Sequence, residues 1–172
     1  EEGEGSAVAD FPNGGLVVVI GNVMHKGPNA QNTRVIAYGM EGLKHERNAL
    51  YVIGNTMVYQ NRRTNSCFVR VEKTPENFRP VIFNNACVGP IPLCNIDKIE
   101  AGGNLLLKSV AEAGFADPAK YDYHLRAGSP CIDKAVALGK LDDFDLAPKF
   151  QYIHPAKSEP RPAVGPLDVG AM

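Results

Sequence analysis

Short apolar runs recur along the first half of the chain, and each ends at a glycine–asparagine or asparagine–asparagine pair. Three stretches superpose on one another: Val17–Lys26 (VVVIGNVMHK), Leu50–Tyr59 (LYVIGNTMVY) and Pro80–Gly89 (PVIFNNACVG). The first two match with an offset of 33, and the third follows 30 positions later. Self-similarity with a period of roughly 20–50 residues predicts a solenoid, in which each coil buries its apolar face against its neighbours.

β-Branched and aromatic residues dominate these runs, which predicts buried strands bounded by turns and stacked in parallel. The strand candidates fall into three groups, one for each part of a coil. They are Leu16–Ile20, Leu50–Ile53 and Val81–Phe83 before the asparagine, Val23–Met24, Thr56–Tyr59 and Ala86–Val88 after it, and Arg34–Tyr38 and Cys67–Val71 farther along. The pattern therefore predicts an all-β chain with up to three strands in each coil.

The asparagines that end the runs fall in one column of the repeat: Asn22, Asn55 and Asn85. Asparagine tolerates the left-handed backbone conformation that a tight bend requires, and its amide bonds local backbone groups. Amides stacked in successive coils are also able to bond one another. We therefore predict a structural ladder at these three positions, with Asn104 as a candidate fourth rung.

The repeat loosens after Gly89, and the end of the chain is rich in proline and glycine. Atypical terminal sequence is typical of a capping segment in a repeat protein. We predict coils over residues 1–114 and an irregular C-terminal cap of the same domain over residues 115–172. In the part of the chain after Gly89, Lys108–Ala113 is expected to form one helical turn and Ser129–Ala137 a short helix.

Composition narrows the class of protein. A chain of 172 residues with 44% hydrophobic residues suits one domain. Its formal net charge of −1 lacks the basic excess of nucleic-acid-binding proteins, and its longest apolar run, Leu16–Ile20, is too short to span a membrane. The four cysteines form no Cys-x-x-Cys pair, which argues against a zinc site and leaves disulfides open.

The chain begins with Glu-Glu-Gly-Glu-Gly-Ser, which has neither the basic nor the apolar region of a signal peptide. Either a signal has been removed or the sequence is a piece of a longer protein. We favour the second alternative, because a solenoid needs a cap at each end and none is recognisable before Asp10. Upstream coils of a longer chain are therefore an expected partner.

Several segments resemble right-handed parallel β-helix proteins of the pectate-lyase-like superfamily. They are YHLRAGSPCID (Tyr123–Asp133), GPLDVGA (Gly165–Ala171), DFPNGG (Asp10–Gly15) and YGMEG (Tyr38–Gly42). The resemblance implies a right-handed parallel β-helix with an irregular C-terminal cap, of which this chain is the C-terminal portion. It also implies an exported bacterial protein (secreted, periplasmic or on the cell surface) that acts on polysaccharide.

The known catalytic motifs of this superfamily are absent. Calcium-dependent pectate lyases carry Arg-x-Pro-x-x-Arg, whereas Arg79-Pro80 and Arg161-Pro162 lack the second arginine. The polygalacturonase motifs are also missing, since Asn32-Thr33 precedes an arginine and Asp142-Asp143 lies in the C-terminal segment. Neither mechanism transfers to this chain. Calcium is compatible with the resemblance, but the sequence does not support it, and we expect no metal or other cofactor.

The repeat places the loop at residues 27–32 beside the loop at residues 60–65. This predicts a surface patch of four residues: Lys26, Tyr59, Arg62 and Arg63. Arginine forks suit carboxylates and aromatic faces suit sugar rings, so the patch is a candidate site for an acidic polysaccharide. An ordinary solvated turn is the alternative interpretation.

A second pair of loops, at residues 39–48 and 72–79, brings together cations and a histidine. Cleavage of a uronic acid by β-elimination needs a base for the C5 proton and a cation that neutralises the carboxylate. Lys44 or His45 is a candidate base, and Arg47 or Arg79 a candidate neutralising group. The alternative is a mixed-charge surface loop with local ion pairs.

Two function hypotheses follow. The first is a carbohydrate-active protein that binds an acidic polysaccharide and, if it is an enzyme, cleaves it by β-elimination as a polysaccharide lyase or by hydrolysis as a glycoside hydrolase. The second is a non-catalytic module with a surface-binding, adhesin-like or structural role. The choice between enzyme and module stays open at this point, because one fold hosts many activities.

Overall fold

The computed structural model describes residues 5–162 and 165–171. Residues 1–4 of the predicted coil segment and residues 163–164 and 172 of the predicted cap lie outside the described residues. The described chain is all-β, with parallel sheets and very little helix. The prediction of an all-β chain with parallel strands is confirmed.

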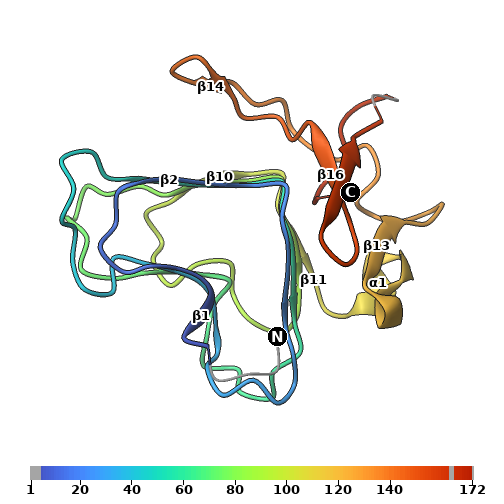
Figure 1. Ribbon diagram of the computed structural model, residues 1–172, viewed down its shortest axis with the longest axis horizontal. Coiled ribbons are helices and arrows are strands. Elements are labelled where there is room, and N and C mark those ends of the chain that lie inside the picture. Colours follow the sequence, from blue (N-terminus) through green and yellow to red (C-terminus); the bar gives the residue numbers. More distant parts are fainter. Residues whose placement is uncertain (1–4, 163–164, 172) are drawn as a thin grey trace.

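Three parallel sheets make up the first two thirds of the chain. The first has the order β1-β4-β7 (Ala7–Phe11, Arg34–Tyr38, Val69–Val71), the second β10-β8-β5-β2 (Glu100–Gly102, Val81–Phe83, Ala49–Ile53, Leu16–Ile20), and the third β11-β9-β6-β3 (Leu105–Leu107, Ala86–Val88, Thr56–Tyr59, Val23–Lys26). The chain visits the three sheets in turn, and we call one such circuit a pass. Figure 1 looks along the stack, so that successive passes overlie one another.

The passes lie in the register that the repeat predicted. Val19 lies beside Val52, which in turn lies beside Ile82. On the third sheet, Met24 lies beside Met57 and Met57 beside Cys87. These side chains point between the sheets and form one apolar core with inward residues of the first sheet. Parallel strands buried on such a face read as continuous apolar runs, which is why the runs were recognisable.

The asparagine column is a continuous hydrogen-bonded ladder. The backbone N and Nδ2 of Asn22 donate to Oδ1 of Asn55 at 2.9 and 3.2 Å. The same two donors of Asn55 reach Oδ1 of Asn85, both at 2.9 Å. Those of Asn85 reach Oδ1 of Asn104 at 3.0 and 2.8 Å. Asn104 is therefore the fourth rung.

The ladder is also tied to the strand backbone of neighbouring passes. Nδ2 of Asn55 donates to the carbonyl oxygen of Val19 at 2.9 Å, and Nδ2 of Asn85 to that of Val52 at 2.8 Å. Asn55 and Asn85 are fully buried, so each polar side chain has exchanged water for protein partners. The ladder therefore fixes both the bend and the spacing between passes.

The left-handed conformation belongs to the residue before each rung rather than to the asparagine of the ladder. Gly21, Gly54 and Gly103 have φ of 65°, 58° and 63°, and Asn84 takes this place in the third pass with φ of 58°. A Cβ on Gly54 would lie 2.5 Å from Cγ of Pro148. Glycine is therefore required there by both conformation and space.

The described part of the C-terminal segment forms three antiparallel hairpins. These are β12–β13 (Phe115–Asp117, Asp122–Leu125), β14–β15 (Lys140–Leu141, Phe144–Asp145) and β16–β17 (Phe150–Ile153, Lys157–Pro160), with a 3-10 turn η1 at Pro118–Lys120. The expected helical turn is α1 (Val110–Ala113), whose first turn is capped by Oγ of Ser109. The helix expected over Ser129–Ala137 is wrong, because this stretch is turn and irregular chain with Asp133 left-handed.

The C-terminal segment lies beside the third sheet (Figure 1). Outward side chains of that sheet, among them Val58 and Val88, form a second core with Phe115, Tyr123 and Val169. The segment is also hydrogen-bonded to the sheet, since the backbone N of Ala171 donates to Oγ1 of Thr56 at 3.0 Å. The third sheet is therefore covered on both faces.

The ladder predicts unequal effects of removing its rungs. Asn55→Ala deletes a fully buried amide and leaves several donors and acceptors without partners, so we expect the free energy of unfolding to fall by roughly 2–4 kcal/mol. Asn22→Ala at the exposed end of the ladder should cost about 1 kcal/mol or less. Urea denaturation of both variants measures the difference. Equal losses would show that burial of the ladder contributes nothing.

Candidate ligand-binding groove

The first predicted surface patch does not form. Lys26 and Tyr59 are buried, with exposed fractions of 0% and 2%, whereas Arg62 and Arg63 are exposed. Side chains alternate between the faces of a strand, so Lys26 shares the inward face of β3 with Met24. The hydroxyl of Tyr59 donates to the carbonyl oxygen of Arg63. The four residues therefore do not share one exposed surface, and Tyr59 lines a hollow on the other face of the third sheet.

Arg63 is engaged by the neighbouring loop. Its Nη1 donates to the carbonyl oxygen of Gln31 at 2.8 Å. The two loops at residues 27–32 and 60–65 thus lie side by side, as the repeat predicted. The bond gives Arg63 a role in holding the loops together.

The second predicted cluster consists of exposed residues whose partners lie outside the cluster, among them Asp142 of the C-terminal segment. Nζ of Lys44 lies 3.7 Å from Glu41, and Nη1 of Arg47 lies 2.9 Å from Asp142. Nη1 of Arg79 donates to two backbone oxygens of its own loop, and His45 packs against Gly15. Among the described residues, no hydrogen bond or ion pair joins any two of the four candidates. This arrangement matches a mixed-charge loop more closely than a catalytic site.

A groove lies instead between the outward face of the third sheet and the start of the C-terminal segment. Two hollows of about 600 and 590 Å³ share Gln60, Val110 and Ala111 in their walls and therefore adjoin. We call them together the binding groove. Its other walls include His25, Val58, Lys108, Phe115, Tyr121, Tyr123 and Arg126.

His25 is held in the groove by two side chains. Because residue 25 alternates with Met24 and Lys26, its ring faces outward from β3. Its Nε2 lies 2.8 Å from Oε1 of Gln60, and its Nδ1 lies 3.3 Å from the hydroxyl oxygen of Tyr123. An amide oxygen only accepts, so this geometry assigns the hydrogen to Nε2 and makes Nδ1 the acceptor of the Tyr123 hydroxyl.

Tyr123 is a hydrogen-bond donor rather than a base at ordinary pH. Its side chain is 1% exposed, and burial raises the pKa of its phenol to about 12. The neutral phenol therefore persists across the physiological range. With both ring nitrogens of His25 bonded, the pair forms a fixed polar floor.

Aromatic rings gather at one end of the groove. Tyr121 is 45% exposed and stacks on His154, with ring centroids 4.8 Å apart and planes at 23°. The ring of His25 lies 5.9 Å from that of Tyr121. An exposed, supported aromatic face binds apolar faces of ligands at low entropic cost.

The groove carries positive charge without acidic side chains in its walls. Arg126 and Lys108 line its two parts, and no aspartate or glutamate of the described chain is among the lining residues. Nε of Arg126 donates to the carbonyl oxygen of Phe115 at 2.6 Å, which fixes the guanidinium at the wall. The groove therefore offers two cations to a ligand, while the carboxylate of Glu112 lies 2.7 Å from the backbone N of Lys108 at its edge.

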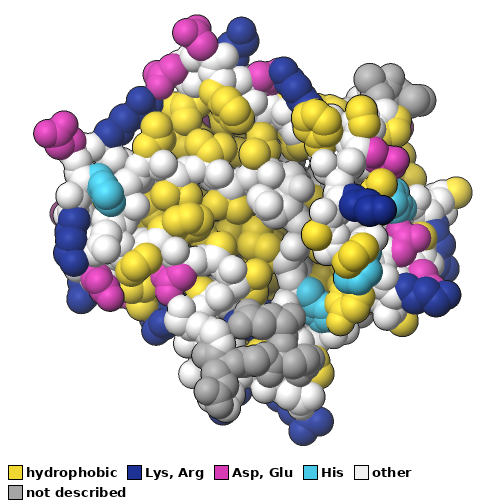
Figure 2. Space-filling model, viewed as in Figure 1, with side chains coloured by type: hydrophobic (Ala, Val, Ile, Leu, Met, Phe, Trp, Pro, Cys, Tyr) yellow, Lys and Arg dark blue, Asp and Glu magenta, His cyan; other side chains and the backbone are white. Residues whose placement is uncertain are grey.

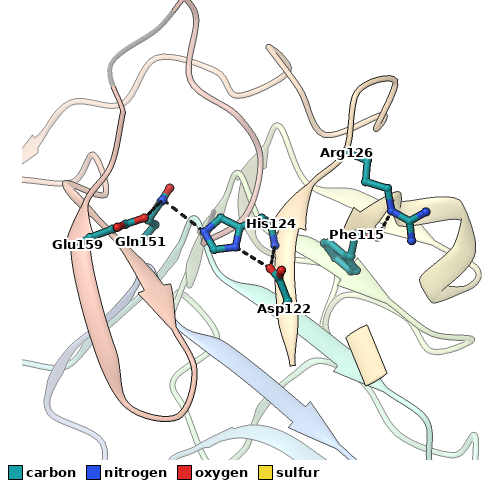
Figure 3. A network of polar contacts seen from close by, with 6 residues as sticks. All are labelled: Phe115, Asp122, His124, Arg126, Gln151 and Glu159. Atoms are coloured by element: carbon teal, nitrogen blue, oxygen red, sulfur yellow. Dashed lines mark hydrogen bonds and ion pairs between the residues drawn. The ribbon is translucent and has the colours of Figure 1, made fainter. Parts of the chain in front are cut away.

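A polar network next to the groove positions the last hairpin (Figure 3). Nδ1 of His124 lies 2.6 Å from Oδ1 of Asp122, and Nε2 of Gln151 lies 2.6 Å from Oε1 of Glu159 and 3.4 Å from Nε2 of His124. Partial burial of Asp122 favours the neutral acid, but the hydrogen bonds from His124 outweigh it and lower the pKa of the carboxyl. The network joins β13 to β16 and β17 and is structural.

The described residues contain no cluster of potential metal ligands, and burial raises the pKa of their cysteine thiols. Within residues 5–162 and 165–171, no group of three or more His, Cys, Asp and Glu side chains is placed to hold a metal ion. The four cysteines are free thiols, and burial raises the pKa of Cys67 to about 11. A thiol with so high a pKa is a poor nucleophile.

Comparison with protein-family models, curated proteins and solved structures gives no match. The resemblance to pectate-lyase-like proteins therefore stays a prediction. No helix of the described part of the chain has the length and apolar character needed to cross a membrane.

The buried phenol generates a prediction about pH. Because the pKa of Tyr123 is raised from 10.0 to about 12 in the folded protein, the unfolded chain releases its proton first. This contribution to stability is complete below pH 10 and is lost as the pH rises toward 12. Tyr123→Phe should therefore show a smaller fall in the free energy of unfolding over this window than the parent. Urea denaturation at a series of pH values measures it; identical slopes would contradict the assignment.

Proposed function

We propose that the chain is a right-handed parallel β-helix of the pectate-lyase-like kind and that it binds an acidic polysaccharide in the binding groove. The fold proposal is supported by the three parallel sheets visited in turn and by the asparagine ladder between passes. The same proposal includes an exported location, whether secreted, periplasmic or on the cell surface.

The observation that carries the binding proposal is the pairing of one exposed aromatic ring with cations in a groove without acidic lining residues. Tyr121 offers a ring face at one end, and Arg126 offers a fixed guanidinium on the same wall. Sugar rings present C–H faces that stack on aromatic rings, and uronate carboxylates suit a guanidinium fork. Gln60 and His25 add hydrogen-bonding groups at the floor.

The shape of the groove suits a chain rather than a single sugar. Its two hollows adjoin through Gln60, Val110 and Ala111, with Lys108 in one and Arg126 in the other. Two cations placed along one groove match the repeated carboxylates of a polyuronate. Both hollows are open to solvent on one side, which allows a long polymer to enter and leave. Figure 2 shows the stack of passes and the C-terminal segment that adjoins it.

Binding is favoured over cleavage. β-Elimination needs a base that is ready to take the C5 proton. His25 has both nitrogens bonded, and the phenol of Tyr123 has a raised pKa, so neither is poised as a base. The non-catalytic module is therefore the form of the proposal that these contacts support best.

Two variants test the groove. Tyr121→Asn removes the ring while retaining a residue that tolerates the left-handed backbone at this position, where φ is 60°. Arg126→Gln removes the fixed charge. We expect each to weaken binding to polygalacturonate, alginate or chondroitin sulfate by about tenfold, measured by isothermal titration calorimetry. Rising salt should weaken binding of the parent chain and affect Arg126→Gln less.

Matched controls separate this groove from other surfaces. Phe150→Ala removes an exposed ring that does not line the groove, and Arg62→Gln removes a charge of the patch that the sequence predicted. Both should bind as the parent does, and thermal unfolding should show all four variants folded. Loss of binding in Arg62→Gln with none in Arg126→Gln would overturn the groove. Ultraviolet absorbance from unsaturated uronate products would overturn the non-catalytic form.

A further inference from the structure

The two ends of the stack of passes differ in structure. Beyond β7, the chain returns over the core, since backbone N atoms of Phe68 and Val69 donate to carbonyl oxygens of Pro92 and Leu93. Apolar residues of this returning segment, including Ile91 and Ile99, pack against the core. The side formed by the first pass has no equivalent cover among the described residues.

The first pass exposes core positions that the next pass buries. A hollow of about 400 Å³ on this side is lined almost entirely by apolar residues: Val8, Ala9, Phe11, Val18, Val19, Val23 and Met24, with Asn22. Ala9 and Phe11 are half-buried, whereas their neighbours Ile36 and Tyr38 in the next pass are fully buried. We call this surface the open end. Figure 2 looks onto it and shows hydrophobic side chains gathered in its middle.

The open end also presents three strand edges together. β1, β2 and β3 are each the terminal strand of their parallel sheet, and all three belong to the first pass. An exposed strand edge carries unpaired backbone groups and is a template for another strand. Three such edges around one apolar hollow match what one pass offers to the next within the stack.

The asparagine ladder stops at this surface with an acceptor in place. Oδ1 of Asn55 accepts from the preceding rung, Asn22, and Oδ1 of Asn85 accepts from Asn55. Asn22 is exposed, and its Nδ2 turns to the carbonyl oxygen of Ile20 in its own strand at 2.9 Å. Its Oδ1 is at the position where a preceding rung would donate.

We propose that the open end binds one further pass of the same repeat in parallel register, with an asparagine one rung before Asn22. The argument is continuity, because every interface between passes in the described chain joins consecutive segments in parallel register. A second copy packed end to end in the opposite direction would run its strands antiparallel and would place no donor on Asn22. This inference does not depend on the binding groove.

An added pass of known register tests the proposal. A copy of residues 34–66 joined directly to Ala7 has the correct length, because Arg34 lies beside Ala7 and Ile36 lies beside Val69. The asparagine copied from position 55 then becomes the rung before Asn22. We expect the melting temperature to rise and the backbone amides of β2 and β3 to exchange about tenfold more slowly than in the 172-residue chain.

The matched control is the same extension with Asn55→Ala in the copy, which should lose most of that protection. An extension that stays susceptible to proteases and leaves exchange unchanged would overturn the proposal. So would equal protection by the control, because the ladder would then have no part in docking. Sedimentation equilibrium of the 172-residue chain tests the alternative occupant of the open end, a second copy of the chain. Self-association that protects β2 and β3 would identify a second copy instead.

Discussion

The hydrogen-bonded asparagine column is the constraint from which the rest of this structure follows. Each rung bonds the next rung and, in the buried passes, a strand carbonyl of a neighbouring pass, so a shift by one residue would break several bonds at once. Buried amides without partners are costly, which makes the register of the stack specific. Stacking in register in turn decides which side chains point inward along all three sheets.

The same register creates both surfaces of interest. On the third sheet, it sends Met24 and Lys26 into the core and turns His25 outward, where the C-terminal hairpins enclose it. At the first pass, it leaves three strand edges and an apolar hollow arranged like those inside the stack. One surface suits a polar, charged ligand and the other suits more of the same backbone. One proposal therefore concerns binding of a charged polymer, and the other concerns apolar packing and backbone hydrogen bonding between passes.

The sequence predicted what repeats and missed what does not. The offset of 33 gave the strands and the ladder, because equal spacing places equal side chains in contact. The alternation of β3 places Lys26 and His25 on opposite faces, whereas the positions of the loops carry no information about which way either side chain points. The groove depends on a contact between Tyr123 and His25, which are 98 residues apart, and no periodicity signals such pairing. The stretch Ser129–Ala137 also lies outside the repeat, between the hairpins β12–β13 and β14–β15, and it forms turns instead of the expected helix.

The most direct measurement is hydrogen exchange of the asparagine side-chain amides, resolved by nuclear magnetic resonance. Because the Asn55 and Asn85 side chains are fully buried and their Nδ2 groups donate to protein acceptors, their hydrogens should be among the slowest-exchanging side-chain amides of the chain. Those of Asn22, at the exposed end, should exchange much faster. Exchange of Asn55 and Asn85 at the rate of a solvated amide would contradict the ladder and the stacking that depends on it.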